Sequence, residues 1–296
     1  MRHLSKRFIF FNMLIISCVM IIYAILVVFS EHSRISTNRM ILAVAISIIL
    51  VFIGSWLLSK IALAPIKAAW QKQLDFTADA SHELRTPLST IQTNLDVVLR
   101  NPTATIESQS KWLKNIEIEN KRMSALVSDL LLLSRADTNE DIINMEKLNL
   151  STLVSKIVAA YDVVIKEKDL TLVSDIRNGI SIQGDKDRIK QLLVILIDNA
   201  VKYNTANGKI NIILSKNERN AVIEISDTGI GIGQEEVTRV FDRFYRGKQS
   251  RINNPDGSGL GLSIAKLITE EHGGRISAES RLEKGAIFRI SIPMPI

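Results

Sequence analysis

An apolar stripe at helical spacing, over residues 84–98, is the feature that most constrains what this chain can fold into. The stripe consists of Leu84, Leu88, Ile91, Leu95 and Val98. Steps of four and three residues are typical of a helix that packs against other helices. In this register His82 lies beside the stripe, where a partner could reach its imidazole, and Thr86 lies one turn further on. Pro87 predicts a kink just after the histidine, because its ring clashes with the preceding turn.

A second helix with its own stripe follows a short turn. Proline disfavours a helical conformation in the residue before it, so Asn101-Pro102 predicts the end of the first helix. The second stripe consists of Leu113, Ile116, Asn120, Met123, Val127 and Leu130. Two such hairpins bury all their stripes when they pair, so we predict a four-helix bundle in a homodimer. An extended regulatory coiled coil fits the same spacing.

Two long apolar runs precede the stripes, and each is long enough to span a bilayer. Lysines and arginines flank their outer ends, which predicts a membrane hairpin with both ends in the cytoplasm. The predicted segments are a cytoplasmic N-terminus (1–7), transmembrane helices (8–29 and 40–58), a short extracytoplasmic loop (30–39) and a linker helix (59–75). We expect the long cytoplasmic helix that leads to His82 to begin at Pro65, in its first turn. A cleaved signal peptide and a lipoprotein site at Cys18 are alternatives, but the first apolar run continues well past Cys18.

The net positive charge of the chain comes entirely from this first part. Residues 1–75 hold eight Lys and Arg against two Asp and Glu, whereas residues 76–296 hold 29 of each. A basic segment beside apolar runs favours a lipid bilayer with an anionic surface as partner, and not nucleic acid. The loop of ten residues is too short to fold as a sensing domain. We therefore expect a stimulus to act in the bilayer, at its surface or through a membrane partner protein.

From about residue 145 the pattern changes to strands alternating with amphipathic helices, which predicts an α+β sandwich with helices on one face of a sheet. The expected helices are 150–168, 185–201, with Asp185 as its cap, and 259–271. The expected strands are 171–175, 180–183, 210–214, 221–227, 275–279 and 286–292.

Four motifs lie on this domain. They are Asp198-Asn199-Ala200-Val201-Lys202-Tyr203, Asp227-Thr228-Gly229-Ile230-Gly231-Ile232-Gly233, Phe241-Asp242-Arg243-Phe244-Tyr245-Arg246 and Gly257-Ser258-Gly259-Leu260-Gly261-Leu262. The amide oxygen of Asn199 can bind Mg²⁺, and Lys202 can meet phosphate oxygens. Asp227 can accept a hydrogen bond from the exocyclic amine of a purine. The glycines let the backbone approach a ligand and place a helix N-terminus at its phosphates.

The run from Phe76 to Leu88 resembles the phosphoacceptor box of sensor histidine kinases. The four motifs resemble, in order, the asparagine, first glycine, phenylalanine and second glycine boxes of an ATP-binding domain. Type II topoisomerases, a heat-shock chaperone family and mismatch-repair ATPases share that domain. The resemblance covers residues 66–296 and implies a dimerisation and histidine phosphotransfer domain (76–140) and an ATP-binding catalytic domain (145–296). It also implies a multi-pass protein of the bacterial cell membrane, with its kinase domains in the cytoplasm, that uses ATP and Mg²⁺.

The resemblance implies roles for three residues of the first box. His82 would take the γ-phosphoryl group of ATP and pass it to an aspartate of a cognate response regulator. Glu83 would accept or orient the proton on the other ring nitrogen. Thr86 would belong to a phosphatase motif, in which its hydroxyl positions water on the regulator's phospho-aspartate.

In the ATP-binding domain the resemblance implies Asn199 on Mg²⁺ and Asp227 on adenine, with Gly229 and Gly231 in the adjoining glycine box. It implies Lys202 and the turn Gly257, Gly259, Leu260 and Gly261 near the phosphates. Residues 230–255 would form a mobile lid. Tyr203 would pack near the nucleotide, although a core aromatic fits as well.

Two departures from the family pattern leave alternatives open. The family usually has an asparagine where this chain has Ile195, and hydroxyls where it has Ala286. A non-catalytic nucleotide-binding membrane receptor or scaffold is therefore a second hypothesis. A chaperone-type or topoisomerase-type ATPase fits less well, because Ile195 occupies the position at which those enzymes usually carry a glutamate base.

Overall fold

The computed structural model describes residues 18–19, 21–23, 25, 37–138, 143–253 and 257–295. They fall in two compact units, which divide after Ala78. The predicted membrane helix 8–29 and loop 30–39 lie mostly outside the described residues. Within the part of the chain that is described, no helix is both long and apolar enough to cross a bilayer.

Helix α2 (Thr37–Leu99) continues through both prolines in its sequence. We expected a helix to begin at Pro65, and that prediction is wrong, because the helix already includes the residues from Thr37 onward. A proline inside a helix removes one N–H donor and crowds one turn, while the turns on either side can continue. Pro87 also lies within α2, where it is buried.

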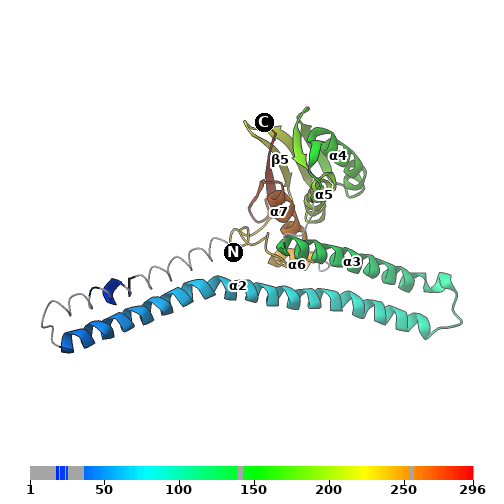
Figure 1. Cartoon of the computed structure of the whole chain (residues 1–296). Coiled ribbons are helices and arrows are strands. Elements are labelled where there is room, and N and C mark those ends of the chain that lie inside the picture. Colours follow the sequence, from blue (N-terminus) through cyan, green and yellow to red (C-terminus); the bar gives the residue numbers. More distant parts are fainter. Residues whose placement is uncertain are drawn as a thin grey trace. The chain divides into compact units, whose positions relative to one another are not determined.

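Helix α3 (Ile106–Thr138) returns along the last part of α2 and forms the predicted hairpin (Figure 1). Gln109 Nε2 donates to the carbonyl oxygen of Val98 at 3.2 Å, so α3 satisfies an acceptor in the last turn of α2. Closer to the middle of the hairpin, Asn115 Nδ2 donates to Oδ1 of the buried Asn94 at 3.3 Å. These two contacts fix the antiparallel register of the hairpin.

The apolar stripes are only partly covered within one chain. Leu88 and Leu95 on α2 are 56% and 38% exposed, and Leu113 and Val127 on α3 are 37% and 42% exposed. Asn94 is buried although it is not part of the stripe, because it contacts α3. The stripe residues thus form an apolar surface that a single chain leaves open to solvent.

The compact unit that follows Ala78 also contains the predicted α+β sandwich. Its five-stranded sheet has the order β2-β4-β5-β7-β6, with β2 and β4 parallel and all other neighbours antiparallel. The strands are β2 (Thr171–Ile176), β4 (Lys209–Lys216), β5 (Asn220–Asp227), β6 (Arg275–Ser280) and β7 (Ala286–Pro293). Helices α4 (Leu150–Glu167), α5 (Lys186–Lys202) and α7 (Gly261–Glu271) pack beside the sheet and against one another (Figure 1).

The core lies between the sheet and these helices. Alternate residues of β4 point into it, and Ile210, Ile212 and Leu214 are at most 1% exposed. On the helical side of the core, Leu196 of α5 and Ile264 of α7 are fully buried. Burial of each such side chain stabilises the fold by about 1.5–3 kcal/mol. This core fixes the positions of α5 and α7, which carry Asn199, Lys202 and Gly261 of the predicted nucleotide residues.

Two short elements were not predicted from the sequence. Strand β1 (Glu146–Asn149) pairs antiparallel with β3 (Ser181–Gly184) in a separate two-stranded sheet. Leu148 is the one buried residue of β1, so its sequence shows no alternation of apolar and polar residues that would predict a strand. Helix α6 (Lys248–Asn253) is a six-residue polar segment without an apolar face.

A buried histidine joins the far ends of α5 and α7. His272 ends α7, and its Nδ1 lies 2.7 Å from the carbonyl oxygen of Ile268. Its Nε2 accepts a hydrogen bond from the backbone N–H of Asp185 at 3.0 Å. Asp185 is the predicted cap of α5, and its carboxylate accepts from the backbone N–H groups of Asp187 and Arg188.

Candidate functional site

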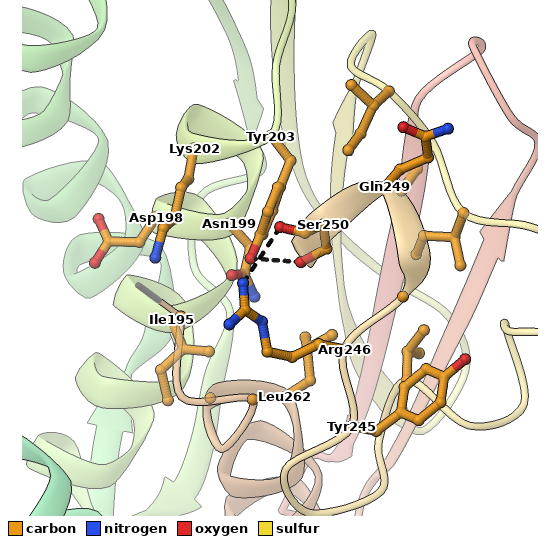
Figure 2. A pocket seen from close by; sticks show the side chains of 18 of the residues that line it. Ile195, Asp198, Asn199, Lys202, Tyr203, Tyr245, Arg246, Gln249, Ser250 and Leu262 are labelled. Atoms are coloured by element: carbon orange, nitrogen blue, oxygen red, sulfur yellow. Dashed lines mark hydrogen bonds between the residues drawn. The ribbon is translucent and has the colours of Figure 1, made fainter. Parts of the chain in front are cut away.

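A cavity of about 290 Å³ lies among α5, α7 and the segment that joins β5 to α7 (Figure 2). This volume is close to the lower end of the range for small-molecule sites. Most of the residues predicted to bind nucleotide line it: Asn199, Lys202, Tyr203, Asp227, Gly231, Gly257, Gly259 and Gly261. Gly229 and Leu260 do not line it.

The last turn of α5 forms one wall of the cavity. Asn199 and Lys202 are three residues apart and share a face of the helix. Ile195, one turn earlier, gives this wall an apolar surface. Asp198 accepts a hydrogen bond from the hydroxyl of Tyr161 on α4 at 2.7 Å, which holds its carboxylate at the edge of the cavity.

Asp227 lies at the end of β5, where two backbone N–H groups converge on it. Gly229 donates to its Oδ1 at 2.8 Å and Ala286 donates to the same oxygen at 3.3 Å. Among the described residues both hydrogen bonds to this carboxylate fall on Oδ1, which leaves Oδ2 for a ligand. Burial raises the pKa of Asp227 to about 6, and the two hydrogen bonds offset this only in part.

The glycine motifs bring backbone segments into close contact. A Cβ atom on Gly229 would lie 2.1 Å from the carbonyl oxygen of Tyr203, so this glycine lets the end of β5 approach the end of α5. Gly259 has φ +72°, and a Cβ there would lie 2.7 Å from the backbone of Phe244. The first turn of α7 follows, and no side chain caps it. Its backbone N–H groups therefore offer a site for an anion.

Leu260 is absent from the cavity wall because its side chain points into the core. Leu260 is fully buried, so it anchors the start of α7 in the core while the glycines on either side line the cavity. Any contact that Leu260 makes with a ligand is therefore through its backbone.

The predicted acceptor, His82, lies on α2 and is exposed to solvent. Thr86 is also exposed, and its hydroxyl donates a long hydrogen bond of 3.5 Å to the carbonyl oxygen of His82. Glu83 is half-buried, and among the described residues no hydrogen bond joins it to His82. His82 does not line the cavity.

Known families and proteins match both parts of this arrangement. Residues 72–139 match the His Kinase A (phospho-acceptor) domain family, and residues 184–296 match the family of histidine kinase-, DNA gyrase B- and HSP90-like ATPases. The sensor histidine kinase RppB of Synechocystis sp. is 36% identical over 254 residues, which cover 86% of this chain and 56% of RppB. The sensor protein CiaH of Streptococcus pneumoniae is 33% identical over 294 residues, which cover 92% of this chain and 66% of CiaH.

A solved structure adds agreement in three dimensions. The Acinetobacter baumannii histidine kinase AdeS superimposes with a TM-score of 0.59 at 28% identity, covering 73% of this chain and 98% of AdeS. The chain belongs to the sensor histidine kinases. It spans 56% of the length of RppB and 66% of that of CiaH.

In this histidine kinase the segment after the first glycine motif closes one side of the cavity. Ser250 on α6 donates its hydroxyl to the hydroxyl oxygen of Tyr203 at 3.0 Å, and Arg246 Nη2 donates to the Ser250 carbonyl oxygen at 3.3 Å. Figure 2 shows the three side chains converging from α5, α6 and the loop before α6. Glu236 accepts from the backbone N–H of Lys248 at 3.1 Å. The hydrogen bond between Ser250 and Tyr203 ties this segment, the predicted lid, to the end of α5, and the other two bonds lie within the segment.

Several residues of the cavity wall were not predicted from the kinase sequence. Asp129 comes from α3 of the hairpin, and Arg246, Gln249 and Ser250 come from the lid. Arg246 is the last residue of the phenylalanine motif, so the sequence pointed to it, but its place in the cavity wall depends on the fold of the lid. No sequence pattern pointed to Asp129, because it lies in a helix far from the nucleotide motifs in sequence.

The kinase family implies Mg²⁺, and the donors at the cavity fit this ion. Among the described residues no three His, Cys, Asp or Glu side chains are grouped to hold a metal by themselves. Mg²⁺ at nucleotide sites commonly takes one or two protein oxygens and completes its shell with phosphates and water. The amide of Asn199 in the cavity wall fits that mode.

Proposed function

We propose that this histidine kinase transfers the γ-phosphoryl group of ATP to His82 and passes it on to an aspartate of a cognate response regulator. One observation carries the proposal. A single chain pairs an exposed imidazole on a helical hairpin with a nucleotide-sized cavity that the same hairpin helps to line.

The cavity suits ATP at both ends. Oδ2 of Asp227 can accept from the exocyclic amine of adenine, while Oδ1 is occupied by backbone donors. The uncapped first turn of α7 and the ammonium of Lys202 can meet the phosphates. Arg246 adds a second cation from the segment that closes another side of the cavity. ATP is therefore the proposed substrate.

In the proposed reaction one ring nitrogen of His82 attacks the γ-phosphorus in line. The nitrogen–phosphorus bond forms as the bond to the bridging oxygen breaks, and ADP leaves with the electron pair. Glu83 accepts or orients the proton on the other ring nitrogen, which makes the attacking nitrogen more nucleophilic. Because this contact is absent in the described state, Glu83 must change rotamer for the reaction. Lys202 and Arg246 stabilise the negative charge on the transferring group.

Asn199 is the residue that would hold Mg²⁺ together with the nucleotide. When bound, the ion supplies charge neutralisation to the phosphates. The replacement of the usual second amide by Ile195 leaves Asn199 with fewer protein partners in this task. We therefore propose a metal site built mainly from Asn199, phosphates and water.

We further propose that the kinase dephosphorylates its regulator. The hydroxyl of Thr86 is exposed one turn beyond His82, where it can orient a water molecule toward a phospho-aspartate on a docked partner. Thr86→Ala should retain autophosphorylation and lose most of the phosphatase activity, measured as the decay of purified phospho-regulator. Equal loss of both activities would contradict the separate role of Thr86.

The exposed stripes support a homodimer. Leu88 and Leu95 on α2 and Leu113 and Val127 on α3 remain open in one chain, and a second hairpin can cover them. Burying such side chains on both partners drives association.

We also propose that residues 8–29 and 40–58 anchor the kinase as a multi-pass protein of the bacterial cell membrane, with the catalytic parts in the cytoplasm. The lengths of the apolar runs and the basic flanks support this. Large apolar side chains such as Ile48, Phe52 and Trp56 are also more than half exposed on α2, as a lipid-facing helix requires. Alkaline carbonate washing of cell membranes tests it, because an anchored protein stays in the pellet. Release of the protein into the wash would contradict the membrane anchor. It would not bear on the proposed kinase reaction.

Radiolabelled ATP tests the kinase proposal directly. The purified chain, given ATP labelled at the γ-phosphate and Mg²⁺, should acquire an acid-labile and alkali-stable phosphoryl group. His82→Gln should abolish this label while ATP binding by calorimetry stays within about twofold, because His82 lies outside the cavity. Label retained by this variant would refute the assignment of His82. ATP binding without any label on the wild-type chain would favour the non-catalytic receptor instead.

A further inference from the structure

One wall of the nucleotide cavity comes from the helical hairpin. Asp129 lies on α3 and lines the cavity together with Asn199 and Lys202 of α5. Helix α3 also packs against α7. Eight residues beyond Asp129, Asp137 accepts two hydrogen bonds of 2.8 Å from Arg243 in the loop that covers the cavity. Asp129 is thus held at the cavity by contacts that do not involve its own carboxylate.

The carboxylate of Asp129 differs from the other three that line this cavity. Asp198 is hydrogen-bonded to Tyr161, Asp227 accepts from two backbone N–H groups, and Glu236 accepts from the backbone N–H of Lys248. Asp129 is half-buried and makes neither a hydrogen bond nor an ion pair with any described residue. Burial raises its pKa to about 6, so it carries a full charge at pH 8. A desolvated charge without a partner beside a ligand cavity finds its partner in the ligand.

The register of the hairpin places Asp129 near the level of the phosphoryl acceptor. The pairs Gln109–Val98 and Asn115–Asn94 define the antiparallel alignment of α2 and α3. When this alignment is extended along the hairpin, His82 on α2 lies opposite about residue 126 on α3. Asp129 is three residues further on, which is within about one helical turn of His82 along the hairpin axis. In the proposed reaction the γ-phosphate passes from the cavity to His82, which assigns Asp129 to the phosphate end of the cavity.

We propose that Asp129 makes the nucleotide site selective for metal-bound ATP over metal-free ATP. This inference rests on the proposed function and adds a residue to it. A charged carboxylate in a low-dielectric wall repels the triphosphate of metal-free ATP. A divalent cation between the two groups removes this repulsion and gives the carboxylate a partner. Asp129 thereby offers the oxygen that Ile195 does not supply from α5.

Calorimetric titration of the full chain with ATP at pH 8, in saturating Mg²⁺ and in excess EDTA, tests the inference. The measured quantity is the ratio of the metal-free Kd to the Kd with Mg²⁺. Asp129→Asn should tighten metal-free binding and leave binding with Mg²⁺ equal or weaker. The ratio should fall by about tenfold, which corresponds to about 1.4 kcal/mol.

Glu117→Gln is the matched control. Glu117 is an exposed acid on the same helix, paired with Lys121 and absent from the cavity wall, so its removal should leave the ratio unchanged. If Asp129→Asn does not fold, as judged by circular dichroism, Asp129→Ser provides the same measurement. An unchanged ratio in a folded Asp129 variant would overturn this inference and leave the proposed kinase intact. Failure of the wild-type chain to bind ATP under either condition would overturn both.

Discussion

Asp227 is placed for binding at a cost to folding. Its pKa is raised from the ordinary 3.8 to about 6, mainly by burial. The folded state therefore binds the proton more tightly than the unfolded state does, and the ionised carboxylate destabilises the fold. This destabilisation is fully present above about pH 6, falls as the pH is lowered, and vanishes below about pH 4.

Asp227→Asn should consequently stabilise the protein and weaken ATP binding. At pH 8 the free energy of unfolding should rise by up to about 3 kcal/mol, and the gain should shrink to about half by pH 5. The affinity for ATP should fall at least about tenfold, because the amide presents its own N–H groups to the adenine amine. Urea unfolding at both pH values and calorimetry measure the two effects. Destabilisation at pH 8 would show that Asp227 serves the fold rather than a ligand.

At the residue scale, sequence reasoning was limited by what a local motif contains. Asn199, Lys202 and Asp227 were predicted because each lies in a short run whose chemistry depends on nearby glycines or on one helical turn. Gly229 and Leu260 belong to the same runs, yet one serves close backbone packing and the other core burial. Such a division of roles depends on tertiary contacts, which spacing alone does not contain.

At the scale of elements, the lid is joined to α5 by the hydrogen bond between Ser250 and Tyr203. Tyr203→Phe removes the acceptor, which should weaken this contact by about 0.5–1.5 kcal/mol. Amide hydrogen exchange over residues 248–253 should then become about three- to tenfold faster. Tyr161→Phe is a suitable control, because it breaks a hydrogen bond to the same helix outside the lid.

Ser250→Ala should accelerate exchange to the same extent as Tyr203→Phe. The double variant should add little, because both substitutions remove one interaction. Additive effects would mean that the two hydroxyls stabilise the lid separately.

The elements predicted well are those with a long periodic pattern. Strands β4 and β5 alternate buried and partly exposed residues over their whole length, and α5 begins at its predicted cap, Asp185. The start of a helix at Pro65 was wrong, because one missing N–H donor does not end a helix whose neighbouring turns are intact. Strand β1 and helix α6 were too short to show a period.

At the scale of the whole molecule, the uncovered stripes predict how the kinase associates. Leu95→Asp places a charge in the proposed interface of two hairpins, so light scattering should report monomers in place of dimers. Ile118→Asp is the control, because Ile118 is 52% exposed on α3 but lies outside the stripe. A dimeric mass for Leu95→Asp would place the interface elsewhere.

The kink expected at Pro87 stays a prediction, as do the segment boundaries and the membrane topology. The homodimer depends on surfaces of two chains, so one sequence indicates it only through apolar residues that one hairpin cannot cover. The hairpin and the sandwich fold could both be predicted, because each has a complete hydrophobic pattern of its own.

The hydrogen bonds of His272 have a consequence for how nucleotide comes and goes. They fasten α7 to α5 at the ends remote from the ligand, and the two helices are also packed side by side. We therefore expect Asn199 and the first turn of α7 to keep their relative positions when a ligand binds. Accordingly, we expect a nucleotide to enter and leave by displacement of the segment that joins β5 to α7, while the two helices stay in place.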